Sequence, residues 1–138
     1  MADVHSKKTR SYNMSQIKAT NTKPELLVRK YLHGKGFRFR LHDKTVFGKP
    51  DLVLKRLKTV VFIHGCFWHG HKNCRYASVP KTNTAFWKKK IAGNIKRDET
   101  VKKQLKKEGW KRIELWECRL KPKKREKTLE RLLLKLSV

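Results

Sequence analysis

The chain has 138 residues, a length that suits one domain with a single modest core. Its 37 lysines and arginines against 11 aspartates and glutamates leave a formal charge of +26, which indicates a polyanionic partner such as nucleic acid, a ribosome or an anionic membrane surface. No apolar run approaches the roughly 18 residues of a membrane span and the N-terminus lacks the apolar core of a signal peptide, so we expect a cytoplasmic protein with no membrane-spanning segment.

The first 20 residues are polar and basic, and the spacing of Met14 and Ile17 allows one short helix over residues 11–19. One interpretation is a solvated arm, since chain ends order poorly unless something ties them down. The other is a basic arm that lies along a DNA groove, with Met14 as a wedge between base pairs. The residue pattern leaves both open.

Residues 22–25 have the pattern of a capping box at the start of a helix. Thr22 is the candidate N-cap, Pro24 falls in the first turn, and Glu25 stands three residues after the cap. An apolar stripe follows, and Gly34 is suited to ending the helix. Because capping is a sufficient structural role for Glu25, the local pattern leaves a catalytic role undecided.

Three short strands are expected next. Residues 37–41 alternate apolar and basic side chains, which is typical of a half-buried strand. Residues 51–54 and 59–64 are mostly apolar and β-branched, and residues 55–58 alone separate them. We therefore predict that these two segments form an antiparallel hairpin.

The hairpin supports a geometric prediction about Asp51 and His64. If the turn centres between residues 56 and 57, Asp51 pairs with Phe62, and His64 becomes its diagonal neighbour on the same face. If the pairing slips by one residue, Ile63 stands opposite Asp51 and His64 moves to the other face. We favour the first register, which brings a carboxylate and an imidazole within reach of each other.

A long helix follows, capped by Asn83 or Thr84 and running to about residue 108. Its remaining positions are mostly lysine. One interpretation is that these lysines form a solvated face of the helix; their number favours the other interpretation, in which they contact phosphates. Lys90 and Asn94, one turn apart, are candidates for base-edge contacts, whereas Trp87 falls on the apolar stripe and locally belongs to the core.

A strand over residues 113–117 and a leucine-rich helix over residues 126–136 complete the expected elements. The order is then helix, three strands, helix, strand, helix. This order predicts an α/β domain with a central mixed β-sheet flanked by helices. No repeat or linker marks a second domain, so we expect residues 1–138 to form one unit.

The segment after the third strand concentrates metal-ligating side chains. Cys66, His71 and Cys74 have the spacing C-x4-H-x2-C, and Cys118 follows a strand that could lie beside them. Three cysteines, an odd number, argue against a disulfide framework in a reducing compartment. A Cys3His set is a common closed, structural zinc site, and we predict one here; the alternative is three separate thiols and an unrelated histidine.

His69 lies between Cys66 and His71. A zinc-clamped loop would hold His69 in a fixed position, as a general base requires. The alternative is an ordinary surface histidine, and the residues alone do not decide between the two.

The residues Gly48-Lys49-Pro50-Asp51 resemble the Pro-Asp start of the PD-(D/E)xK nuclease pattern, in which a carboxylate holds Mg²⁺. The next strand departs from that pattern. It offers Phe62-Ile63-His64 where a carboxylate and a lysine are expected, so that His64 and His69 are the available groups.

Taken together, the motifs resemble the very-short-patch-repair (Vsr) family of DNA mismatch endonucleases over about residues 1–120. The matching stretches are MADVH at residues 1–5, Thr9-Arg10-Ser11 with Asn13-Met14, Gly48-x-Pro50-Asp51, residues 64–69 (HGCFWH), Val79-Pro80 with Thr82, Phe86-Trp87, Asn94 with Arg97-Asp98, and Trp116-Glu117-Cys118. Two departures lie in the zinc loop: Lys72-Asn73 is one residue longer than the family form, and Gly70 replaces a histidine.

The resemblance implies a restriction-endonuclease-like fold and a monomeric, nucleoid-associated bacterial-type enzyme. Such an enzyme would nick one strand of duplex DNA 5′ to the T of a T:G mismatch, with Mg²⁺. This nick would initiate very short patch repair of deaminated 5-methylcytosine, with mismatch-repair proteins as candidate partners.

By the same resemblance, Asp51 and the backbone carbonyl of Ile63 bind Mg²⁺, His69 is the general base, and His64 and Glu25 assist around the metal and its waters. The family's structural zinc maps onto Cys66, His71, Cys74 and Cys118. The aromatic side chains of Phe67, Trp68 and Trp87 would wedge beside the mismatch and replace lost stacking at roughly 1–3 kcal/mol per base.

Two other classes of function remain at this point. A nuclease of the same fold that cuts a methylated or unmodified restriction-type site would use the same catalytic residues and ignore mismatches. A zinc-stabilised DNA-binding or ribosomal protein would explain the charge and the zinc ligands. It would give no reason for Asp51, His64 and His69 to converge.

Overall fold

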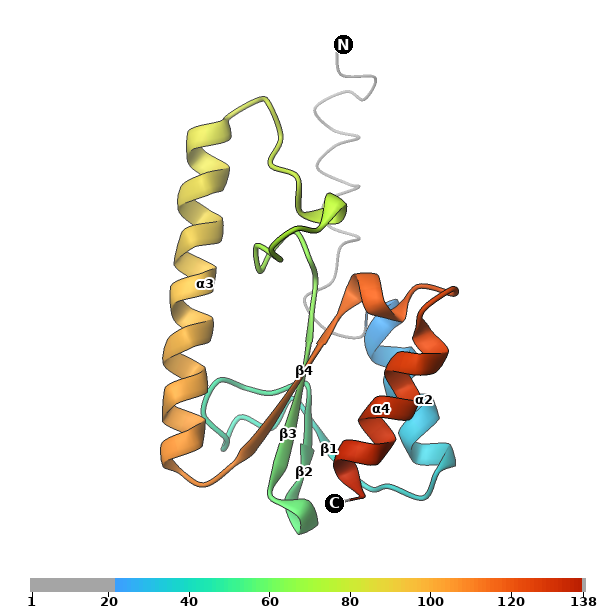
Figure 1. The fold of residues 1–138 in the computed structure, drawn as a ribbon. Coiled ribbons are helices and arrows are strands. Elements are labelled where there is room, and N and C mark those ends of the chain that lie inside the picture. The colour runs from blue at the N-terminus through green and yellow to red at the C-terminus, as the bar shows by residue number, and fades with distance from the viewer. Residues whose placement is uncertain (1–21, 138) are drawn as a thin grey trace, which may run out of the picture.

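The computed structural model describes residues 22–137, so the expected N-terminal helix and Met14 lie outside the described residues (Figure 1). The helices and strands, in chain order, are α2 (Lys23–Gly34), β1 (Arg40–Leu41), β2 (Leu52–Leu54), β3 (Thr59–His64), α3 (Thr84–Lys107), β4 (Lys111–Trp116) and α4 (Arg125–Leu136). Single 3-10 turns are η1 (Lys55–Leu57), η2 (Arg75–Ala77) and η3 (Glu117–Leu120). Over these residues no helix is long and apolar enough to cross a membrane.

The strands form one mixed sheet in the order β1-β2-β3-β4. The first two pairings are antiparallel, and β3 with β4 is parallel, with α3 as the crossover between them. The predicted mixed sheet is confirmed. The predicted strand over residues 37–41 was too long, because β2 has three residues and offers ladder partners to Arg40 and Leu41 alone.

The hairpin has the register that we favoured. Leu54 pairs with Thr59, which centres the turn between residues 56 and 57 and places Asp51 opposite Phe62. The one-residue slip is thereby excluded. The Asp51 carboxylate then accepts a hydrogen bond of 2.6 Å from the backbone N–H of Ile63, which ties the start of β2 to the end of β3.

Both faces of the sheet are covered by helices, with α2 and α4 on one face and α3 on the other (Figure 1). On the first face Leu52, Leu54 and Val61 pack against leucines of α2 and α4. On the second, Val53, Val60 and Phe62 pack against Val101 and Leu105 of α3. Burial on both faces explains why β3 is a continuous apolar run.

Helix α3 begins where predicted, after Asn83, but without the predicted side-chain cap. Asn83 has a φ of +55°, and the Thr84 hydroxyl donates to backbone carbonyls of the preceding turn instead of accepting from the helix. The N-terminal half of α3 extends past the strands and runs beside the loop that follows β3 (Figure 1). This overhang brings α3 side chains to the candidate site.

The loop that follows β3 approaches α3 closely at Gly70. Its φ is +58°, and a Cβ atom built there would come within 2.7 Å of the side chains of Ile91 and Ile95. A histidine at this position would therefore be strained and would collide with the helix. The departure from the family pattern at residue 70 fits this close packing.

Candidate active site and metal centre

Three side chains from separate elements form an acidic cluster at the start of β2. Glu25 projects from α2, His42 follows β1, and Asp51 precedes β2, and one ligand atom from each lies within 4.8 Å of the others. The Nε2 of His42 is 3.3 Å from Glu25, and its Nδ1 is 3.9 Å from Asp51. Carboxylate oxygens are the ligands that hard divalent cations prefer, so this cluster is able to hold one.

Burial raises the pKa of Asp51 to about 6, and the nearby Glu25 carboxylate adds to the rise. The hydrogen bond from the Ile63 N–H opposes it. Glu25 is already paired with the Arg29 guanidinium, so Asp51 is the desolvated carboxylate that a divalent ion would compensate, and such an ion would restore its ionised form. The electrostatics of the cluster therefore fit a metal site.

The Glu25 side chain belongs to the acidic cluster in addition to its position in the first turn of α2. The Thr22 hydroxyl does cap α2, accepting from the Glu25 N–H at 3.4 Å. The Glu25 carboxylate, 2% exposed as a residue, pairs with Arg29 at 2.8 Å and faces His42. The structure thus brings Glu25 together with Asp51, as the resemblance implied, and adds Arg29 and His42, which the sequence pattern did not indicate.

The second cluster is built on His69. Its Nδ1 lies 2.7 Å from the Asp98 carboxylate, which α3 supplies from 29 residues along the chain. A proton on Nδ1 that is donated to Asp98 leaves Nε2 free to accept another proton. Burial and the neighbouring His64 lower the pKa of His69 despite Asp98, which keeps the imidazole neutral at pH 7, as a general base must be.

His64 lies between this pair and the outer strand. Its ring centroid is 4.0 Å from that of His69 and 5.1 Å from that of Trp116. Its Nε2 is 3.6 Å from Glu114, which also pairs with Arg112 at 2.7 Å. The hydrogen bond with His64 and the pairing with Arg112 lower the pKa of Glu114 to about 2, so this carboxylate stays ionised beside the imidazole.

One hollow joins the two clusters. It has a volume of about 250 Å³, and Asp51, Ile63, His64, His69 and Asp98 all line it. The Asp51 carboxylate, two imidazoles and the Asp98 carboxylate therefore face the same space. This arrangement can position a metal ion and activate a water beside it.

Asp98 is the functional candidate that residue patterns missed. It stood among the stretches that resemble the family, without an assigned role. Its distance from His69 in sequence gives no local signal, because the contact depends on the overhang of α3.

The four predicted zinc ligands do come together, with one ligand atom each from Cys66, His71, Cys74 and Cys118 within 4.8 Å of one another. The Cys118 sulfur lies 3.5 Å from Nδ1 of His71, close to the separation of about 3.6 Å that two such ligands have on tetrahedral zinc. Burial raises the pKa of the Cys66 thiol to about 12, so only a cation would hold it as a thiolate. The donor set fits a closed metal site.

Three aromatic residues next to the hollow form a separate cluster. Phe67, Trp68 and Trp87 meet edge to face, with ring centroids 5.2 to 5.8 Å apart. Trp87 is half-buried in this cluster and not in the core, against the local expectation. Phe67 and Trp68 share a cavity of about 520 Å³ with Glu25 and His69, so the aromatics border the candidate site.

Lys90 and Asn94 lie on α3 beside these aromatics. The Asn94 amide donates to the backbone carbonyl of Trp68 at 2.8 Å, which makes it a brace for the loop. The Lys90 ammonium is exposed and lies 5.9 Å from the Trp68 ring centroid. Lys90 is therefore the freer of the two to reach DNA.

A family model described as DNA mismatch endonuclease Vsr matches residues 2–75. The chain is 51% identical to the type II nicking enzyme V.NmeAIP of Neisseria meningitidis serogroup A, over 89% of this chain and 87% of the relative. It is 44% identical to the type II nicking enzyme V.XorIIP of Xanthomonas oryzae, over 87% and 88%. It is 43% identical to the DNA mismatch endonuclease Vsr of Escherichia coli K12, over 88% and 77%.

Proposed function

Since this chain belongs to the family of Vsr DNA mismatch endonucleases and is a DNA endonuclease, we propose that it nicks one strand of duplex DNA 5′ to the T of a T:G mismatch, using Mg²⁺. The nick would start the repair of deaminated 5-methylcytosine. The enzyme would act as a single-domain monomer, because one asymmetric mismatch needs one active site. The observation that carries the proposal is the convergence of Asp51 and the His69–Asp98 pair on one hollow.

Asp51 and the backbone carbonyl of Ile63 would hold the Mg²⁺ ion, with Glu25 and His64 ordering its waters. A bound Mg²⁺ supplies stabilisation of the negative charge that develops on the phosphate. The Asp51 carboxylate accepts a hydrogen bond from the N–H of Ile63, the residue whose carbonyl is the other proposed ligand. The two proposed ligands are therefore held by the hairpin register itself.

His69 would take the proton from the attacking water at Nε2. Asp98 accepts the hydrogen bond from Nδ1, fixes this tautomer and stabilises the imidazolium that forms. The neutral resting state of His69, which its lowered pKa favours, is the state that the reaction requires.

Cys66, His71, Cys74 and Cys118 would hold a structural Zn²⁺ ion. Its role would be to tie the loop after β3 to the end of β4, and thereby to fix His69 and the aromatic residues that this loop carries.

Phe67, Trp68 and Trp87 would stack on bases exposed beside the mismatch, since a T:G wobble pair opens more easily than a matched pair. Met14, which lies outside the described residues, would act as a wedge between base pairs. Lys90 and Asn94 on α3 would contact base edges. These contacts are what would distinguish the enzyme from a restriction-type nuclease that ignores mismatches.

The test is strand-resolved cleavage of end-labelled duplexes with Mg²⁺, comparing T:G with T:A in several flanking sequences. We expect one nick 5′ to the mismatched T in the wild type and none in Asp51→Ala. Equal cutting of T:A duplexes would favour the restriction-type nuclease instead.

A further inference from the structure

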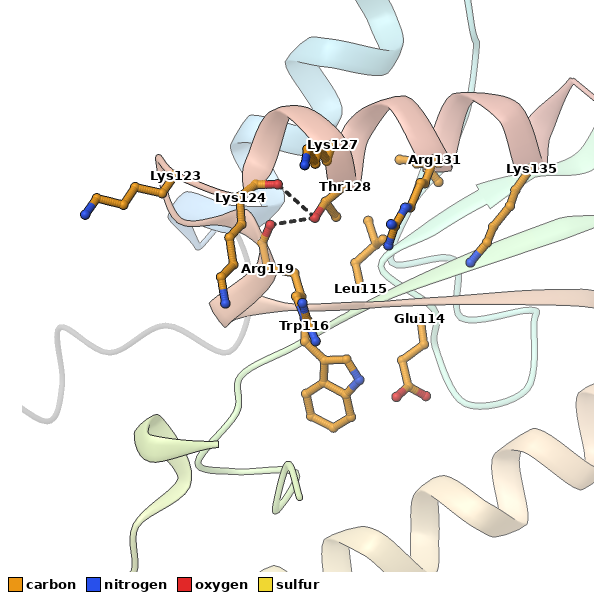
Figure 2. Close-up of a pocket in the computed structure, with 11 residues that line it drawn as sticks. Glu114, Leu115, Trp116, Arg119, Lys123, Lys124, Lys127, Thr128, Arg131 and Lys135 are labelled. Carbon is orange, nitrogen blue, oxygen red and sulfur yellow. Dashed lines mark hydrogen bonds between the residues drawn. The ribbon is translucent and has the colours of Figure 1, made fainter. Parts of the chain in front are cut away.

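A basic groove lies outside the catalytic hollow, between α4 and the edge of β4 (Figure 2). Its volume is about 450 Å³. In the sheet that the structure describes, β4 pairs with β3 along one edge, and the groove follows its other edge. Leu115 and Leu132 line its apolar part, and the cationic side chains that line it are Arg119, Lys123, Lys124, Lys127, Arg131 and Lys135.

The cations are placed on one side of α4, not scattered by a basic composition. Lys127, Arg131 and Lys135 are spaced at intervals of four residues and follow one another along the helix (Figure 2). Like charges at this spacing destabilise a helix, so helix stability does not explain them. The helix's own acids, Glu126 and Glu130, do not line the groove, although Glu130 stands three residues after Lys127.

The acidic residue that lines the groove does not neutralise it. Glu114 lies 2.7 Å from Arg112 and 3.6 Å from His64, and all three residues line a second hollow. This second hollow has a volume of about 300 Å³ and shares His64, His69 and Asp98 with the catalytic hollow. The groove therefore keeps an excess of positive charge.

Two hydrogen bonds hold the groove in shape. The Thr128 hydroxyl donates to the backbone carbonyl of Arg119 at 2.7 Å, joining the start of α4 to η3. The Lys111 ammonium donates to the carbonyl of Lys135 at 2.6 Å, joining the end of α4 to the start of β4. A surface fixed at both ends loses less entropy when a ligand binds.

We propose that this groove binds backbone phosphates of the DNA duplex beyond the nicked position, an inference that rests on the proposed function. Glu114 and Trp116 line both the groove and the second hollow, and that second hollow shares His64, His69 and Asp98 with the catalytic hollow, so the groove connects to the catalytic hollow through it. The helical stripe from Lys124 to Lys135 spans about 16 Å, the axial length of about five nucleotides of one strand. Phosphate contacts there would add affinity without reading sequence.

The test compares two charge-matched double variants. Lys127→Gln/Arg131→Gln removes one lysine and one arginine from the groove, and Lys55→Gln/Arg56→Gln removes the same pair from η1, at the far end of the β2–β3 hairpin (Figure 1). All four side chains are exposed, so both variants should fold, which melting curves check. The measured quantity is the dissociation constant for a T:G duplex against salt concentration, without added Mg²⁺.

For the groove variant we expect the slope of log affinity against log salt to become shallower by about 1.8, the value for two lost phosphate contacts. The η1 variant should keep the wild-type slope, and both variants should keep the preference for T:G over T:A. Equal slopes in the two variants would overturn the proposal and leave an acidic protein partner as the occupant of the groove. A wild type that binds but does not nick T:G duplexes would refute the proposed function and not this inference.

Discussion

Two of the side-chain groups that could hold a metal ion flank the C-terminal end of β3, and they differ in what surrounds them. The Cys/His group draws all four donors from protein, including the fully buried Cys66, and so resembles a closed site. The acidic group consists of Glu25, His42 and Asp51, and its Asp51 lines a hollow shared with His69. A closed set of donors ties chain segments together, whereas an open one leaves positions for water and substrate.

The acidic group should also destabilise the metal-free folded protein, whereas the Cys/His group should stabilise the fold when it holds a metal ion. The pKa of Asp51 is about 6, against 3.8 in the unfolded chain, so the folded state binds the proton more tightly. Stability from this residue is present below pH 3.8 and is lost as pH rises towards 6. At neutral pH the ionised Asp51 lowers the free energy of unfolding of the metal-free protein by up to about 3 kcal/mol. Such a loss of stability is common at functional sites.

The largest expected effect comes from neutralising Asp51. Asp51→Asn should lower the nicking rate by at least about 10⁴-fold, because the proposed metal loses its carboxylate. The same change should raise the melting temperature of Mg²⁺-free protein at pH 7.5 by several degrees, since it removes a buried charge. Single-turnover nicking and thermal melts check both effects. A lower melting temperature of Asp51→Asn would show that the buried Asp51 carboxylate does not destabilise the folded protein.

The orienting carboxylate gives the next largest effect. Asp98→Asn should reduce the nicking rate about 10²- to 10⁴-fold with little change in DNA affinity, because His69 loses its preferred tautomer. The adjacent exposed Glu99 supplies the matched control, Glu99→Gln, which should nick at the wild-type rate. Wild-type activity in Asp98→Asn would remove Asp98 from the mechanism.

Removing one aromatic should affect recognition more than chemistry. Trp68→Ala should weaken binding to a T:G duplex by about 1–3 kcal/mol, roughly 5- to 150-fold, while binding to T:A changes less. Phe47→Ala removes a more exposed ring that is not part of the cluster and should leave both affinities unchanged. If the two variants lose the same affinity, the rings do not stack on DNA.

The smallest effect is a pH dependence of the metal requirement. Protons compete with Mg²⁺ for Asp51, whose pKa is about 6. The Mg²⁺ concentration for half-maximal nicking should be constant well above pH 6 and should rise about tenfold per unit as pH falls well below it. Titrations of Mg²⁺ between pH 5 and 8 measure this, and a flat requirement would assign the metal to other ligands.

Much of this architecture could be predicted because it depends on neighbouring residues. The turn at residues 55–58 sets the hairpin register, and the short spacing of Cys66, His71 and Cys74 brings three donors together. Asp98 and His42 could not be predicted, because each reaches the site through tertiary packing that no local pattern encodes. Strand β1 was overestimated for a similar reason, since its length is limited by its partner β2.

The most direct test of the division between a structural and a catalytic site is the metal content and melting temperature of three purified proteins: the wild type, Asp51→Asn and Cys118→Ser. We predict one bound zinc per chain in the wild type and in Asp51→Asn. Cys118→Ser should bind less zinc and melt well below the wild type, because it loses a donor that joins β4 to the loop after β3. Equal zinc content and equal melting temperatures in all three proteins would contradict the division.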